Sequence, residues 1–218
     1  MAKENFHREM LSIIEEIKNS KIDHKPKLLL HACCAPCLSH CLELLAQTFD
    51  ITIYYYNPNI HPQQEYFRRL EELENFLTIF PVAVNNQIKL VKDDYHVEDF
   101  FTATNVQEEV ELQIEPAKGE RCRRCYQFRM TRAWEFAEEN QFDYFTTTLS
   151  ISPHKDSKKI DSIGRQLEKL SHDKKLKFLP SDFKKENGFL RSLQLSDEFN
   201  LYRQDYCGCI YSNLNQKK

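Results

Sequence analysis

Glycine is scarce in this chain, and its scarcity argues against several common nucleotide sites. The 218 residues include four glycines, which are Gly119, Gly164, Gly188 and Gly208. No G-x-G-x-x-G pattern follows an expected strand, which disfavours a Rossmann-type nicotinamide or flavin site. A phosphate-binding P-loop is also missing, and the segment after the first expected strand lacks the glycines and serines of an ATP pyrophosphatase loop. Electrons for a redox reaction would therefore have to arrive through a metal or through thiols.

Long apolar runs are absent as well. No run approaches the roughly 20 apolar residues that cross a bilayer, and the first ten residues, MAKENFHREM, contain no signal-peptide apolar core. We expect no membrane contact and a location in the reducing cytoplasm, where structural disulfides are rare. The net charge of −3 gives no global attraction to a polyanion. On charge alone, the basic stretches at 121–132, 155–159 and 174–177 are interpreted as solvated faces; a nucleic-acid track would need them on one side of the fold.

Strand and helix patterns alternate along most of the chain. Helical spacing is found at 4–19, 38–48, 62–79, 95–102, 120–140 and 156–170. Short apolar or β-branched runs at 27–32, 51–56, 88–91, 142–149 and 176–179 predict strands, and the acidic segment 104–118 is expected to be irregular. This alternation predicts an α/β fold with a mostly parallel sheet, helices on both faces, and a cysteine-bearing C-terminal tail.

Polar loops follow three of the expected strands. The first strand ends at Cys33-Cys34, the second at Asn57-Pro58-Asn59, and a later one at the SISPHK segment 150–155. In parallel α/β sheets, ligands bind beyond the carboxyl ends of the strands. We therefore expect these loops to share one rim.

All eight cysteines lie in clusters. They are Cys33, Cys34, Cys37 and Cys41, then Cys122 and Cys125, then Cys207 and Cys209. Free structural cysteines scatter as small core hydrophobes, whereas four clustered thiolates hold either structural zinc or an iron–sulfur cluster. A structural zinc usually joins two similar CxxC hairpins, whereas here one cysteine pair ends an expected core strand and the other lies far along the chain. This arrangement favours an iron–sulfur cluster over a zinc ribbon. Cys41 is assigned to the core because it lies inside an apolar helix, and Cys37 is either a ligand or a nearby thiol.

The Cys207-Gly208-Cys209 segment is a separate case. Two cysteines flanking a glycine can close a small, strained disulfide, and strained, accessible disulfides are the redox-active kind. The alternative is that one or both sulfurs bind metal.

The combined motifs resemble one family. The segments LLLHACCAPC, YYYNPNIHPQQEY, GERCRRCYQFRM, FTTTLSISPHKD and the terminal YCGC together look like the cobalamin-independent epoxyqueuosine reductases of the QueH type. The similarity runs from about residue 28 to about residue 211. It implies a Rossmann-like, nucleotide-hydrolase-like fold in a single domain over 1–218, with a helical extension at 1–25 and a metal-binding catalytic domain at 28–211.

The resemblance also implies a reaction and a set of site residues. The family removes the epoxide oxygen of epoxyqueuosine at the wobble position of tRNA, the last step of queuosine synthesis, with an external electron donor. It carries a [4Fe–4S] cluster, whose expected ligands here are Cys33, Cys34, Cys122 and Cys125. Cys207 and Cys209 would form a redox-active pair. A competing arrangement in the family adds a mononuclear iron near Cys37, Cys207 and Cys209; some relatives have Asp where this chain has Cys37.

Other rim residues are candidates by position only. Four could donate a proton within hydrogen-bond reach of the substrate, and each is more simply a turn or packing residue: Tyr66, His154, Asp205 and Tyr206. Asn57 and Asn59 shape a turn and could also contact a base or sugar. Lys155 and Arg121 could meet the phosphates beside a wobble nucleotide that leaves its stack.

Three other functions compete with the reductase. A tRNA-thiolating enzyme on a similar fold, some of which carry clusters, would need ATP and the missing phosphate loop. A zinc-stabilised binding module would be colourless, whereas an iron–sulfur protein is brown. A thiol–disulfide oxidoreductase would keep its activity after chelation.

Overall fold

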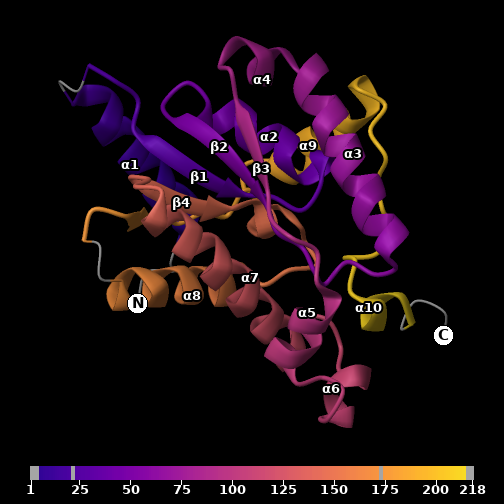
Figure 1. Ribbon diagram of the computed structural model, residues 1–218. Coiled ribbons are helices and arrows are strands. Elements are labelled where there is room, and N and C mark those ends of the chain that lie inside the picture. Colours follow the sequence, from indigo (N-terminus) through magenta and orange to yellow (C-terminus); the bar gives the residue numbers. More distant parts are fainter. Residues whose placement is uncertain (1–4, 21–22, 172–173, 215–218) are drawn as a thin grey trace.

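The computed structural model describes residues 5–20, 23–171 and 174–214. Within them, one parallel sheet has the strand order β3-β2-β1-β4-β5 (Figure 1). The strands are β1 (Lys27–His31), β2 (Asp50–Tyr55), β3 (Lys89–Lys92), β4 (Tyr144–Thr147) and β5 (Lys177–Phe178). The expected α/β fold with a parallel sheet is therefore confirmed.

Helices cover both faces of the sheet. They are α1 (Phe6–Asn19), α2 (Ala35–Leu45), α3 (Gln63–Ile79), α4 (Pro81–Asn85), α5 (Val97–Thr104), α6 (Val110–Ile114), α7 (Glu120–Glu139), α8 (Ser157–Leu170), α9 (Gly188–Glu198) and α10 (Ile210–Leu214), with a 3₁₀ turn, η1, at Thr148–Ile151. Figure 1 shows α2, α3 and α9 on one side of the sheet and α7 with α8 on the other. The short helix α10 lies beside α5 at the far end of α7 from the sheet.

The alternation of side chains along each strand explains this layering. Successive side chains of a strand point to opposite faces, so Leu28 and Leu30 pack with α1, α2, α3 and α9, while Leu29 packs with α7 and α8. Strand β2 repeats the pattern, with Ile53 on the first face and Tyr54 on the second. The two apolar clusters hold the sheet between the helical layers.

Several boundaries differ from the sequence prediction. Helix α2 begins at Ala35, not at residue 38, because Pro36 occupies its first turn, where a missing backbone N–H costs nothing. Helix α6 occupies part of the segment expected to be irregular; at five residues it is too short to show a period. Helix α9 was not predicted from the sequence, because it begins at Asn187-Gly188, a pair that also signals a turn. Strand β4 stops at Thr147, and the residues after it form η1.

The carboxyl ends of the central strands meet at one rim, as predicted. His31 at the end of β1 is in register with Tyr54 of β2 and with Thr147 of β4. The Asn57 side chain, just beyond β2, donates a 2.9 Å hydrogen bond to the carbonyl of Ala32, just beyond β1. The loops after β1, β2 and β4 therefore lie side by side.

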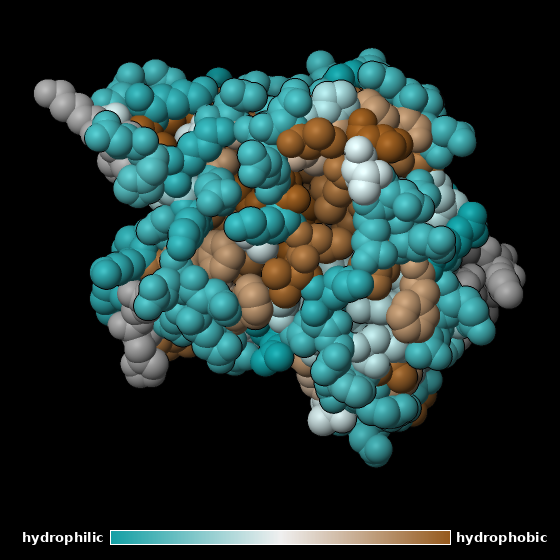
Figure 2. Space-filling view, turned by 45° about the horizontal axis from the view of Figure 1, so that its top comes forward, coloured by the Kyte–Doolittle hydropathy of each residue, from teal (hydrophilic) through white to brown (hydrophobic). Residues whose placement is uncertain are grey.

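Hydrophilic side chains cover most of the face shown in Figure 2, and apolar ones gather in its central hollow. Among the residues that the structure describes, no helix is long and apolar enough to span a bilayer.

Candidate metal and thiol site

Three cysteine sulfurs gather where β1 turns into α2. The Sγ atoms of Cys33, Cys34 and Cys37 all lie within 4.8 Å of one another, and those of Cys33 and Cys34 are 3.8 Å apart. Cys34 is the extended N-cap of α2, and Cys37 lies in its first turn. Helix N-termini favour negative charge, so the start of α2 helps to stabilise a thiolate in this group. The earlier helix start thus brings Cys37, left undecided by the sequence, into this group.

Because the three thiols lie so close together, one of them has a lowered pKa and the other two have raised pKa values. Hydrogen bonds from Cys34 and Cys37 hold the pKa of the Cys33 thiol well below its ordinary value, with smaller help from Lys155 and Arg129. Donation to Cys33 raises the pKa of Cys34, and likewise raises the pKa of Cys37 well above its usual range. One thiolate therefore forms readily here, and each further thiolate needs a cation beside it.

A cavity of about 480 Å³ opens directly above this group. Its lining includes five cysteines from three segments: Cys37, Cys122, Cys125, Cys207 and Cys209. Cys33 and Cys34 reach it through their contact with Cys37. Cys41 is fully buried within the main apolar cluster, which confirms its assignment to the core. The structure thus brings seven of the eight cysteines to one rim of the sheet.

Helix α7 supplies two of these sulfurs from its first turns. The Glu115 carboxylate caps the helix by accepting from the backbone N–H groups of Glu120 (2.6 Å) and Arg121 (2.8 Å). Cys122 is half-buried and Cys125 is buried. Burial raises the pKa of Cys125 to about 11, although the nearby Arg129 guanidinium opposes the shift. Both thiols are therefore protonated near neutral pH unless a cation joins them.

The Cys207-Gly208-Cys209 turn completes the cavity from the C-terminal tail. Gly208 has φ of +105°, a conformation that favours glycine, and a Cβ there would lie 2.8 Å from Ile60. Its carbonyl accepts a 2.8 Å hydrogen bond from the backbone N–H of His61. The Tyr206 hydroxyl donates to the His61 carbonyl at 2.6 Å. The tail is therefore fixed against the loop that follows β2.

The two thiols of this turn differ in environment. Cys207 is exposed at the rim, whereas Cys209 is buried. Desolvation opposes ionisation of Cys207, but the Lys155 ammonium and the hydrogen bond to Ser212 outweigh it and lower the pKa of this thiol. Burial and the charge of Cys207 raise the pKa of Cys209 well above its usual value. Cys207 is therefore the more nucleophilic member of the pair.

Arg69 on α3 ties the tail to the body of the protein. Its buried guanidinium bonds to Glu65 at 2.7 Å and donates to the carbonyls of Tyr206 (3.3 Å) and Cys207 (3.4 Å). Removing one partner of a buried pair leaves the other charge uncompensated, which typically costs about 3–5 kcal/mol. We expect Arg69→Met to lower the free energy of unfolding by about this amount and to expose the tail to protease.

Urea unfolding and limited proteolysis measure the two effects. Lys89→Met, which removes an exposed charge at the edge of the sheet, is the matched control and should change stability by no more than about 0.5 kcal/mol. Equal stability and equal protease resistance of Arg69→Met and the wild type would contradict this role for Arg69.

A buried polar network lies behind the cysteines, and sequence reasoning missed it. His31 Nδ1 is 2.8 Å from Thr147 Oγ1, its Nε2 is 3.2 Å from the Tyr56 carbonyl, and Arg129 donates to the Asn57 side chain. Burial and the Arg129 charge lower the pKa of His31 to about 3, so this imidazole is neutral. The only signal in the sequence was that His31 and Asn57 end neighbouring strands.

The other candidates from the sequence fall into two groups. Lining the cavity are His154, Asp205, Tyr206, Asn59, Lys155 and Arg121. Tyr66 lies elsewhere: it is buried, its hydroxyl donates to the Asp93 carbonyl at 3.4 Å, and its ring packs on Tyr55 and Tyr95. Asn57 is engaged by Ala32 and Arg129. Tyr66 and Asn57 therefore have structural roles.

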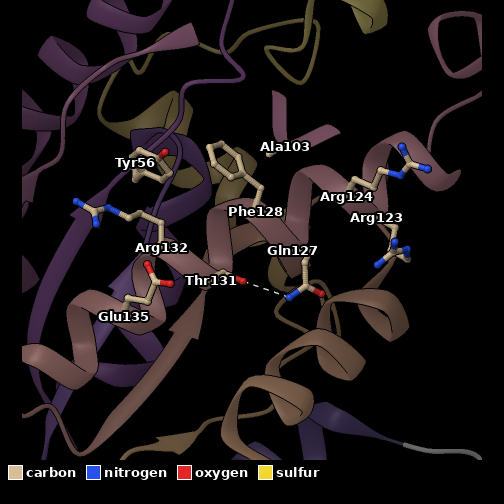
Figure 3. Close-up of a pocket in the computed structure, with 9 residues that line it drawn as sticks. All are labelled: Tyr56, Ala103, Arg123, Arg124, Gln127, Phe128, Thr131, Arg132 and Glu135. Carbon is tan, nitrogen blue, oxygen red and sulfur yellow. Dashed lines mark hydrogen bonds between the residues drawn. The ribbon is translucent and has the colours of Figure 1, made fainter. Parts of the chain in front are cut away.

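A second cavity, of about 600 Å³, lies along another face of α7 (Figure 3). It is lined by Tyr56, Ala103, Arg123, Arg124, Gln127, Phe128, Thr131, Arg132 and Glu135. Arg123 is paired with Glu120 (2.6 Å) and Arg132 with Asp93 (2.7 Å). None of the described residues that line it is a cysteine, so the sulfur-lined cavity is the candidate site.

The residues of that cavity fit a thiophilic metal group. Thiolate sulfurs are the ligands of zinc, iron and iron–sulfur clusters, and the raised thiol pKa values show that a cation is needed to ionise the whole set. The buried Arg129 Nε, which also lines the cavity, lacks a hydrogen-bond partner among the described residues. It offers an N–H donor to sulfur or to a bound group.

Comparison with solved structures supports the fold. The U34-tRNA thiolase NcsA from Methanococcus maripaludis, solved with its [4Fe-4S] cluster, aligns with a TM-score of 0.51 at 17% identity. The alignment covers 95% of this chain and 68% of the thiolase. At this identity the similarity concerns the fold alone.

Sequence comparison identifies the family. The family model for epoxyqueuosine reductase QueH matches residues 28–215. Epoxyqueuosine reductase QueH of Streptococcus pyogenes serotype M1 is 39% identical over 95% of this chain and 78% of its own length. The protein of that name from Acinetobacter baylyi is 37% identical over 90% and 84% of the two chains, and that from Thermotoga maritima is 31% identical over 88% and 92%. This chain belongs to the epoxyqueuosine reductase QueH family.

Proposed function

We propose that this chain reduces epoxyqueuosine to queuosine at the wobble position of tRNA, the last step of queuosine biosynthesis. As a member of its family, the chain is an oxidoreductase. The observation that carries the proposal is the convergence of cysteines at the carboxyl rim of the sheet, where five of them line one cavity and two more lie against Cys37. Such a cavity is concave and sulfur-rich, and it is large enough for one base.

In this proposal Cys33, Cys34, Cys122 and Cys125 hold a [4Fe–4S] cluster. Cys33 and Cys34 are in contact, and Cys122 and Cys125 line the cavity that Cys37 also lines. The close approach of Cys37 to Cys33 and Cys34 supports the alternative in which a mononuclear iron binds nearby, with Cys37, Cys207 or Cys209 as ligands. When bound, these centres would transfer electrons singly and polarise an oxygen as a Lewis acid.

Cys207 and Cys209 can supply the electrons and protons that the reaction consumes. Converting an epoxide to an alkene takes two electrons and two protons, and the oxygen leaves as water. Two thiols that close to a disulfide release two electrons and two protons. Cys207, with its lowered pKa, ionises first, and an external electron donor then reduces the disulfide.

The cavity has polar and cationic walls suited to a nucleotide. Lys155 lines it and would meet a phosphate beside the modified base, whereas the Arg121 guanidinium, which also lines the cavity, is buried and donates to the carbonyls of Leu112 and Gln113. Bases of an anticodon loop leave their stack at modest cost, so the wobble base can enter. His154, Asp205 and Tyr206 line the same cavity and are candidate proton donors. The reaction would take place in the cytoplasm, where tRNA is modified.

Anaerobic purification tests the proposal. We expect a brown protein with iron and acid-labile sulfide, which converts epoxyqueuosine in tRNA to queuosine when a reductant is supplied and ATP is omitted. Nucleoside analysis of the digested tRNA measures conversion. A colourless zinc protein, an ATP requirement, or activity that survives chelation would favour a binding module, a thiolase or a simple thiol oxidoreductase instead.

A further inference from the structure

Two buried amide oxygens in the sulfur-lined cavity lack hydrogen-bond partners. Oδ1 of Asn59 and Oε1 of Gln204 are both shielded from solvent, and neither accepts a hydrogen bond from the described residues. Both residues line the cavity. A buried acceptor without a partner destabilises the protein, so such atoms are normally satisfied by water or by a ligand.

The neighbouring sulfur fixes the orientation of the Gln204 amide. Its Nε2 donates to Cys34 Sγ at 3.0 Å. The Cys34 thiol donates its own proton to Cys33, so its sulfur is left to accept and the NH₂ group must face Cys34. The oxygen then has to face away from the sulfur, where it is left without a donor.

The Asn59 side chain is held by a rigid loop. The backbone N–H of Ile60 donates to the Asn57 carbonyl at 3.0 Å, and the Ile60 carbonyl accepts from the Tyr95 hydroxyl at 2.8 Å. Asn59 itself is 3% exposed. A fixed backbone on both sides leaves the amide little freedom to turn away, so its oxygen is preorganised for a donor.

Two acceptors select a ligand that donates. A phosphate has no proton to give at neutral pH, and an epoxide oxygen only accepts, so neither suits these oxygens. Neutral hydroxyl groups do. The five-membered ring of epoxyqueuosine carries two hydroxyls next to the epoxide, and this is the part of the substrate that must reach the sulfurs.

We propose that the Asn59 and Gln204 carbonyl oxygens accept hydrogen bonds from the ring hydroxyls of the substrate and so distinguish epoxyqueuosine from an ordinary guanosine. This inference rests on the proposed function and adds the subsite that recognises the modification. Gln204 also connects the two parts of the site, because one amide contacts both the Cys34 sulfur and the ring. The two residues act by positioning the epoxide.

Binding measurements on the metal-loaded protein test this subsite. The affinity for a tRNA with epoxyqueuosine at the wobble position is compared with that for the same tRNA with guanosine there. We expect the wild type to prefer the modified tRNA, and Asn59→Ala and Gln204→Ala each to reduce this preference roughly five- to tenfold. The affinity for the guanosine form should not change, because its contacts involve other residues.

Controls separate the subsite from the metal centre and from folding. Gln194→Ala changes an exposed glutamine of α9 and should leave the preference unchanged. Iron content is measured for each variant because Gln204 contacts Cys34. If Asn59→Ala fails to fold, Gln204→Ala still decides, since it lies in the tail outside the apolar core. An undiminished preference in a folded, iron-loaded Gln204→Ala protein would overturn the inference. A wild type that binds both tRNAs equally would also overturn the inference, whereas a metal-loaded wild type that fails to convert epoxyqueuosine in tRNA would overturn the proposed function.

Discussion

Serine in place of Cys33 is expected to abolish both iron binding and turnover. The pKa of the Cys33 thiol is lowered because Cys34 and Cys37 donate to it, and this thiol lies 3.8 Å from the Cys34 sulfur. A serine hydroxyl is a much poorer ligand than a thiolate for soft iron–sulfur centres. We expect the visible absorbance to fall to the level of the apoprotein and the conversion of epoxyqueuosine to fall below detection. Iron and sulfide assays, with absorption spectra taken without air, measure the loss.

Cys41→Ala provides the matched control for that substitution. Cys41 belongs to the same N-terminal cluster of cysteines, but it is fully buried in the apolar core and its Sγ donates to the Cys37 carbonyl at 3.3 Å. Its replacement should cost some stability and leave iron content unchanged. Normal iron content in Cys33→Ser would refute the ligand assignment. Loss of the metal in Cys41→Ala alone would show that a different sulfur binds it.

Cys209→Ser is expected to have the second largest effect, and to affect a different property. If Cys207 and Cys209 form the redox pair, the variant should keep its iron and its colour and lose turnover by at least about a hundredfold, the scale seen when a group that acts in the chemical step is removed. Thiol titration before and after a single turnover measures the pair directly. The wild type should lose two free thiols per product formed, and the variant none.

The iron content of Cys209→Ser distinguishes the two roles considered for the tail. Cys209 is buried beside Cys125 and has a strongly raised pKa, an environment that suits either a resting thiol or a metal-bound sulfur. Loss of iron together with activity would assign the tail to metal binding and contradict a disulfide relay. Ser212→Ala, which removes the hydrogen bond from Cys207, should alter the rate less than either cysteine change.

The sequence predicted the sheet and its rim because both depend on local patterns. The continuous apolar run Leu28, Leu29 and Leu30 predicted a buried strand, and the shared rim of the loops at Cys33 and Asn59 followed from parallel strand order. The clustering of cysteines also indicated a single site, because cysteines are rarely grouped in this way by chance.

Long-range contacts of single residues were not predictable in this way. Arg129 lies on a helix of mixed polarity, and nothing in the pattern distinguishes it from Arg132, which is exposed. Arg129 is nevertheless buried against Asn57 and His31. Arg69 likewise gave no sign that it would hold the tail. The partners of Arg129 and Arg69 lie far from them in the sequence, so tertiary packing decides which groups these arginines meet. The grouping of Cys37 with Cys33 and Cys34 required knowing where α2 begins.

The docked tail has a consequence for the order in which the protein matures. Residues 203–209 come later in the chain than nearly all other residues that line the cavity. While the polypeptide leaves the ribosome, the sheet and α7 can therefore assemble an open, sulfur-lined basin before Gln204 and Cys207 arrive. Inorganic iron or a delivery protein would find its widest entrance in that interval. Docking of the tail against Arg69 would then narrow that opening.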